Sequence, residues 1–218
     1  MLKHKPCAYC GSKAVPRGKG HVFPRSIYPD TLPDAKRITV PECETCKAIW
    51  EDAEPHFRNV LLSIWDPEVA PLDNRTAKLW RSFDELDGSR RIQDLSAMLR
   101  PAHVDGQERA KIYPDEDERF NLILRRIVRG LSHEHRLGTA IPDSAVVSGV
   151  MRWIVPPAFE PSFSWHTIAP DFISYAYARV DESHTFWLLR FSRHITFFAS
   201  IGPVVGVNRP GFRAGRLI

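Results

Sequence analysis

The chain has 218 residues, of which 43% are hydrophobic and 26% are charged, and its formal net charge is +4. This composition excludes a wholly disordered chain, a collagen-like chain and a coiled-coil rod, and no apolar run approaches the roughly 18 residues that a membrane-spanning helix needs. The first residues carry charge without an apolar stretch behind them, so the sequence predicts no secretory signal and a soluble, cytoplasmic protein.

Charge is unevenly distributed along the chain. Residues 1–58 carry a net charge of +3, residues 59–118 of −5 and residues 119–218 of +6, and every basic residue of the last range is arginine. Arginine recognises phosphate in a bidentate manner that lysine cannot match. The two basic ends therefore favour a polyanionic partner such as nucleic acid, although basic surfaces without such a partner are common.

The four cysteines form two Cys-x2-Cys pairs near the N-terminus, Cys7 with Cys10 and Cys43 with Cys46. In a chain without a secretory signal, two such pairs are typical of a four-thiolate zinc site rather than of disulfides. Zn²⁺ takes four thiolates in a tetrahedron, and a site with four protein ligands has no open position, so the predicted zinc is structural. The alternatives are unrelated buried thiols or a redox pair.

Between and after the cysteine pairs, the sequence predicts short strands and then a helix. Strand-forming pieces occur at residues 21–23 and 37–40. From residue 49 to residue 64 the apolar positions recur at helical spacing, and Pro55 is expected to kink or delay this helix. The order of these pieces predicts a small treble-clef-like zinc module over residues 1–65.

Residues 66–218 are predicted to form a second domain, helical at first and then β-rich. Helices are expected at 74–86 and 90–99, followed by a loop over 101–114 with a weak strand at 110–113. A longer helix has an apolar stripe from Phe120 to Leu131, follows an acidic run, and carries arginines on its other face, namely Arg125, Arg126 and Arg129.

Three strands are expected at 173–180, 185–191 and 194–199, with a hairpin turn at 181–184. The predicted fold class is therefore α+β: a small zinc-stabilised ββα module, followed by helices and a C-terminal antiparallel β-rich region.

The segment over residues 5–62 resembles the four-cysteine type of HNH endonuclease. The matching runs are Cys7-Ala-Tyr-Cys10-Gly, Gly20-His-Val-Phe-Pro24 and Ile38-Thr-Val-Pro-Glu-Cys43-Glu-Thr-Cys46, with a helical run to Glu54, Phe57 and Arg58. The resemblance implies a ββα-metal fold whose histidine acts as general base on a water that attacks a phosphodiester. It also implies one divalent metal, usually Mg²⁺, which stabilises the developing negative charge.

The resemblance assigns the general base to His21. Three positions depart from the family pattern: Gly20 stands where a carboxylate is usual, Arg37 where asparagine is frequent, and Lys47 where asparagine or histidine is typical. Because Mg²⁺ needs oxygen donors, two alternatives stay open. Either Glu54, or one of Asp52, His56 and Asn59, supplies a single ligand, or a metal-free site neutralises the phosphate with basic side chains.

The function implied by the resemblance is an HNH-type endonuclease or nuclease-like protein that acts on DNA phosphodiesters, of a kind found in defence or mobile-element systems. The catalytic residues would be His21 and Glu54, and the candidate phosphate-binding residues are Lys19, Arg25, Arg37 and Lys47. The departures favour an alternative, a catalytically inactive zinc module that binds nucleic acid or a protein partner. A third alternative places the function in the C-terminal domain. RNA instead of DNA, and a dimeric state, are also left open.

Overall fold

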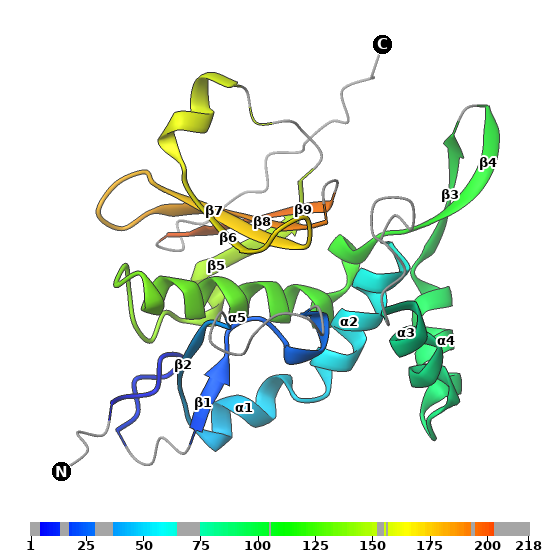
Figure 1. Cartoon of the computed structure of the whole chain (residues 1–218), viewed down its shortest axis with the longest axis horizontal. Helices are drawn as coiled ribbons and strands as arrows, with labels where there is room; N and C mark the ends of the chain where they lie inside the picture. The colour runs from blue at the N-terminus through cyan, green and yellow to red at the C-terminus, as the bar shows by residue number, and fades with distance from the viewer. Residues whose placement is uncertain are drawn as a thin grey trace.

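A computed structural model describes residues 5–13, 18–28, 37–64, 75–104, 106–151, 155, 157–192 and 195–202. The fold is mixed α+β, with a five-stranded antiparallel sheet in its C-terminal part. Helix α5 (Glu118–Glu134) lies between this sheet and the N-terminal hairpin and helices (Figure 1). Among the described residues, no helix is long and apolar enough to cross a membrane.

The N-terminal segment contains a hairpin followed by two helices. Strands β1 (Gly18–His21) and β2 (Thr39–Glu42) pair antiparallel, and α1 (Glu44–Trp50) begins directly after β2. Helix α2 (Ala53–Ser63) follows after two residues. Pro55 has no N–H to bond the carbonyl group of residue 51, so it interrupts the helical run and lies in the first turn of α2, where no donor is needed. The delay expected at this proline is thus confirmed.

The middle of the chain confirms two predicted helices and corrects a predicted loop. Helices α3 (Arg75–Asp84) and α4 (Gly88–Ala97) are followed by an antiparallel hairpin of β3 (Leu99–Val104) and β4 (Gln107–Ile112). Gly106 adopts a positive φ of 74° at its turn. The weak strand expected at 110–113 overlaps the end of β4, but the loop expected over the rest of 101–114 was wrong. The hairpin is largely exposed and therefore lacks the apolar alternation that marks a half-buried strand.

The C-terminal sheet has the strand order β5-β9-β8-β7-β6, and every neighbouring pair is antiparallel. Its strands are β5 (Val146–Val150), β6 (Ser164–Ala169), β7 (Ile173–Arg179), β8 (Thr185–Phe191) and β9 (Ile195–Ile201). The three strands expected from the sequence are confirmed as β7, β8 and β9, although residue 194 lies outside the described residues. Short 3-10 helices occur at Arg25–Ile27, Pro114–Glu116, Asp143–Ala145 and Pro157–Ser162.

One cluster of buried residues joins the N-terminal segment to the sheet through α5. Phe57 of α2 packs against Phe120 of α5, with ring centroids 4.5 Å apart, and against Phe191 of β8 at 5.9 Å. Phe120 also contacts Phe197 of β9 at 5.1 Å. The hydrophobic core therefore includes residues from both predicted domains. The boundary predicted at residues 65 and 66 itself lies outside the described residues.

At its C-terminal end α5 meets the sheet through His135. The His135 Nε2 atom lies 2.9 Å from the Tyr175 hydroxyl oxygen, and the His135 and His166 ring centroids are 4.7 Å apart. Burial lowers the pKa of His135, and charge on His166 lowers it further, whereas Glu134 raises it. The folded chain therefore binds a proton on His135 less readily than the unfolded chain does.

We expect this difference to make stability depend on pH. An unfolded histidine titrates near about pH 6.5, so the contribution of His135 is complete above that pH and is lost as the pH falls toward the lowered folded-state pKa. Urea denaturation at a series of pH values should show the free energy of unfolding falling below about pH 6.5, and His135→Phe should reduce that fall. His103→Gln, on the exposed β3–β4 hairpin, is the control. An unchanged pH profile in His135→Phe would contradict this assignment.

Candidate metal centre and adjoining cavity

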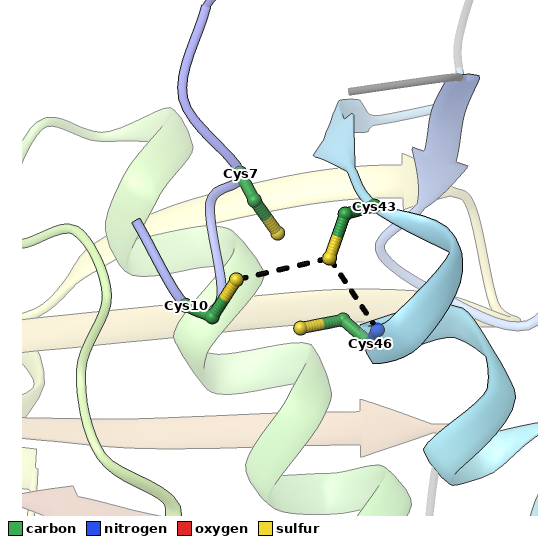
Figure 2. A group of neighbouring side chains, drawn as sticks. All are labelled: Cys7, Cys10, Cys43 and Cys46. Atoms are coloured by element: carbon green, nitrogen blue, oxygen red, sulfur yellow. Dashed lines mark hydrogen bonds between the residues drawn. The ribbon is translucent and has the colours of Figure 1, made fainter. Parts of the chain in front are cut away.

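The four cysteines meet in space (Figure 2). Their sulfur atoms all lie within 4.8 Å of one another, and the Sγ atoms of Cys10 and Cys43 are 3.7 Å apart. Four sulfurs bound at about 2.3 Å to one tetrahedral zinc ion stand about 3.8 Å apart, whereas disulfide-bonded sulfurs stand about 2.05 Å apart. All four thiols are free. The cluster could therefore hold a metal ion such as zinc.

Local backbone structure positions each cysteine pair. In the first pair, Gly11 adopts a positive φ of 72° and donates its N–H to the Cys7 carbonyl oxygen at 2.9 Å. In the second, Cys43 caps α1, and its Sγ accepts a hydrogen bond from the Cys46 N–H at 3.5 Å. Burial raises the pKa of the Cys46 thiol. A bound cation would oppose that burial effect, because a coordinating thiol is deprotonated.

A cavity of about 270 Å³ opens over β1, the start of α1 and the start of α2. Its lining includes five residues assigned from the sequence: Lys19, His21, Arg25, Lys47 and Glu54. We call it the His21 cavity. His21, at the end of β1, is half-buried, whereas the three cationic side chains are exposed. Arg37 is not among the lining residues, and its guanidinium lies 5.4 Å from the Tyr28 ring centroid.

The cavity also contains Arg126 of α5, which the sequence placed on the face of its helix opposite the apolar stripe. In the structure the Arg126 side chain is buried there, at 3% exposed. Its Nη2 donates to the His21 carbonyl oxygen at 3.0 Å and lies 3.5 Å from Glu42 Oε1, and its Nη1 pairs with Glu54 Oε1. Its guanidinium carbon lies 4.8 Å from the Trp50 ring centroid. No sequence signal identified these contacts, because helical periodicity does not distinguish a buried arginine from a solvated one.

Arg129, one turn further along α5, is also buried rather than solvated, at 9% exposed. Its Nη2 donates to the Tyr9 carbonyl oxygen at 2.9 Å, and its Nη1 lies 3.2 Å from Asp143 Oδ1. Arg126 and Arg129 therefore bind α5 to two separate backbone carbonyl groups of the N-terminal segment, at His21 in β1 and at Tyr9. Only Arg126 lines the His21 cavity.

A second unanticipated residue is Glu42, at the end of β2. It is 6% exposed, and its Oε1 accepts a hydrogen bond from Trp50 Nε1 at 2.9 Å. A Cβ atom added at Gly20 would stand 2.2 Å from Glu42 Oε2, so position 20 has to be glycine while Glu42 is buried there. Burial raises the pKa of Glu42, and the charge of Arg126 lowers it.

The other candidate ligands lie away from the His21 cavity. The His56 Nε2 atom lies 2.7 Å from Oδ2 of Asp117, the residue that caps α5. Asn59 accepts a hydrogen bond from Arg58 at 3.0 Å. Asp52 lines a separate cavity of about 210 Å³ between α2, α4 and α5. Of the four acidic or polar side chains considered on α2 and before it, only Glu54 lines the His21 cavity.

The residues around His21 do not fit a catalytic Mg²⁺ site. Four carboxylates line the cavity. Glu54 and Glu42 are both paired with Arg126, Glu44 lies 3.8 Å from Lys47 Nζ, and Glu51 is exposed. Within the described part of the chain, the four cysteines are the one group of three or more potential metal ligands close enough to share an ion. Divalent cations of this kind require several oxygen ligands.

No family model, curated protein or solved structure matches the chain. The function of the cavity therefore has to be inferred from its own residues.

Proposed function

We propose that the chain is an HNH-type nuclease in which a structural zinc ion holds the turn that carries Cys7 and Cys10 to the start of α1, and the His21 cavity binds a phosphodiester of DNA. One observation carries the proposal. His21 and Lys19 of β1, together with two exposed cationic side chains on other elements, Arg25 and Lys47, line a single cavity. Such a group combines a proton acceptor with charges that bind phosphate.

The zinc ion would be bound by Cys7, Cys10, Cys43 and Cys46. The 3.7 Å distance between two of the sulfurs suits tetrahedral zinc. When bound, zinc would supply structural stabilisation without chemistry at the phosphate, because four protein ligands leave no position for water or substrate. Its role would be to fix the start of α1 against the turn that carries Cys7 and Cys10, and thereby the positions of Glu42 and Lys47 on either side of Cys43.

In the proposed reaction His21 acts as general base. A neutral imidazole accepts a proton from water, the water oxygen forms a bond to phosphorus, and the bond from phosphorus to the leaving oxygen breaks. The leaving oxygen takes a proton from solvent. Lys19, Arg25 and Lys47 stabilise the negative charge that develops on the phosphate oxygens, which is the contribution that fixed cations make in phosphoryl transfer.

A second candidate function is a zinc module that binds nucleic acid without cleaving it. The pairing of Glu54 with Arg126 favours it, because a carboxylate bound to a buried guanidinium is less available for catalysis. Both candidates require phosphate binding at the same cavity. They differ only in whether His21 activates a water that cleaves the phosphodiester.

Nicking of supercoiled plasmid DNA distinguishes the two candidates. We expect the wild-type protein to nick the plasmid and His21→Ala to be at least about 100-fold slower, which is the usual contribution of a general base. His103→Gln, on the distant exposed hairpin, serves as the control and should nick like the wild type.

Equal and negligible nicking by all three proteins, with salt-sensitive DNA binding retained, would support the non-cleaving candidate. If no DNA binds even at low salt, both candidates are wrong.

A further inference from the structure

We infer that Arg126 is the resident counter-ion of the His21 cavity, and that the cavity binds a phosphate group without a divalent metal ion. The phosphate part of this inference rests on the proposed function. The part that concerns Arg126 rests on contacts within the chain alone.

Arg126 neutralises two of the four carboxylates that line the cavity, Glu42 and Glu54. Its Nη1 pairs with Glu54 Oε1, and its Nη2 lies 3.5 Å from Glu42 Oε1. Glu42 Oε1 also accepts a hydrogen bond from Trp50. A divalent cation at this position would have to displace a guanidinium that already bonds both carboxylates.

The guanidinium is held firmly enough to act as a fixed charge. Arg126 is 3% exposed, its Nη2 donates to the His21 carbonyl oxygen at 3.0 Å, and its charge lies over the Trp50 ring. A guanidinium does not lose its proton in proteins, and desolvated cation–π contacts add to its stability. Because α5 lies outside the segment that carries the cysteines and His21, the cavity is complete only when α5 is in place.

The space beside Gly20, where the family pattern has a metal-binding carboxylate, is also filled. Glu42 Oε2 occupies the position that a side chain at Gly20 would take. Lys47 brings a further positive charge to the lining. Lys19, Arg25 and Lys47 are exposed and can close around a phosphate, whereas Arg126 stays with the carboxylates.

The decisive experiment uses Mn²⁺ as a paramagnetic probe of the full-length, zinc-loaded protein in the absence of DNA. Mn²⁺ binds more weakly than zinc to a given site, so it leaves the thiolate cluster intact. We expect the imidazole resonances of His21 to broaden no more than those of His184, which is exposed and lies beside the carboxylate of Asp181. Selective broadening of His21 at low Mn²⁺ would overturn the inference, whether or not DNA binds.

A second arm measures binding of a short DNA duplex by fluorescence anisotropy at constant ionic strength, with and without Mg²⁺. The dissociation constant should stay the same or rise slightly, because Mg²⁺ competes for the phosphates. A decrease of about tenfold or more in the presence of Mg²⁺ would show that the cavity recruits a metal and would contradict the inference. Absence of DNA binding in both conditions would contradict the proposed function. It would not affect the Mn²⁺ test of whether Arg126 excludes a metal ion.

Arg126→Gln gives the complementary test, because it releases Glu42 and Glu54. In this variant we expect Mn²⁺ to broaden His21 selectively, a change that a merely structural role would not produce. A folded Arg126→Gln without such broadening would contradict the role of Arg126 as counter-ion. If Arg126→Gln does not fold, Arg126→Lys replaces it, because lysine keeps the positive charge but lacks the planar guanidinium that can bond two carboxylates. This variant should show broadening of His21 between that of the wild type and that of a metal-binding site. Broadening no greater than in the wild type would count against the inference.

Discussion

Cys46→Ser is expected to abolish metal binding and to unfold the N-terminal segment. Structural zinc sites of small modules contribute apparent binding free energies of about 10–16 kcal/mol at neutral pH, and that energy is folding energy because the site does not exist in the unfolded chain. Cys46 lies in the first turn of α1, and losing it would release α1 from the loop that carries Cys7 and Cys10. Metal analysis should give about one zinc per wild-type chain and much less in the variant.

The matched control keeps a ligand at the cluster. Cys10 is the exposed member, and Cys10→His would leave a Cys3His set, which zinc also accepts in structural sites. We expect Cys10→His to retain zinc and most of the thermal stability, and Cys10→Ala to lose both. A wild-type protein that contains no zinc and melts at the same temperature in the presence of a chelator would show that the cluster is not a metal site.

Arg126→Met is expected to lower the free energy of unfolding by about 3–5 kcal/mol, the usual cost of removing one partner from a buried ion pair. The reason is that Glu42, at 6% exposed, and Glu54 would lose their positive partner, and the His21 carbonyl oxygen would lose its donor. Urea denaturation measures the change directly.

Arg119→Met on the same helix is the control. Arg119 is 42% exposed, and its ion pairs with Asp94 and Asp117 should each contribute at most about 1 kcal/mol. Combining Arg126→Met with Glu54→Gln should recover part of the loss, because it removes a half-buried carboxylate that has lost its positive partner. An Arg126→Met variant no less stable than Arg119→Met would mean that the Arg126 contacts contribute nothing and would remove the basis of the counter-ion inference.

Helices, strands and the cysteine cluster could be predicted from the sequence where short-range spacing of residues marks them. The paired spacing of Cys7, Cys10, Cys43 and Cys46 anticipated a cluster because each Cys-x2-Cys turn fixes two ligands by backbone geometry alone. The long helix α5 and strands β7, β8 and β9 were predicted because each buries one face, and burial of one face imposes a period on the sequence. The β3–β4 hairpin buries little and therefore left no period to find.

The candidate site also combines features that the sequence predicted with features that only the structure shows. The sequence placed His21 among basic residues, and its resemblance to the HNH pattern singled out Gly20, Arg37 and Lys47 as departures from that pattern. Only the tertiary structure placed Arg126 against the His21 carbonyl oxygen, across 105 residues of chain, and against Glu54, across 72. The physical reason is that periodicity records whether a side chain is apolar, not which charge it meets. In the sequence, a buried arginine on a helix therefore cannot be distinguished from a solvated one. Only the tertiary structure shows which carboxylates it contacts.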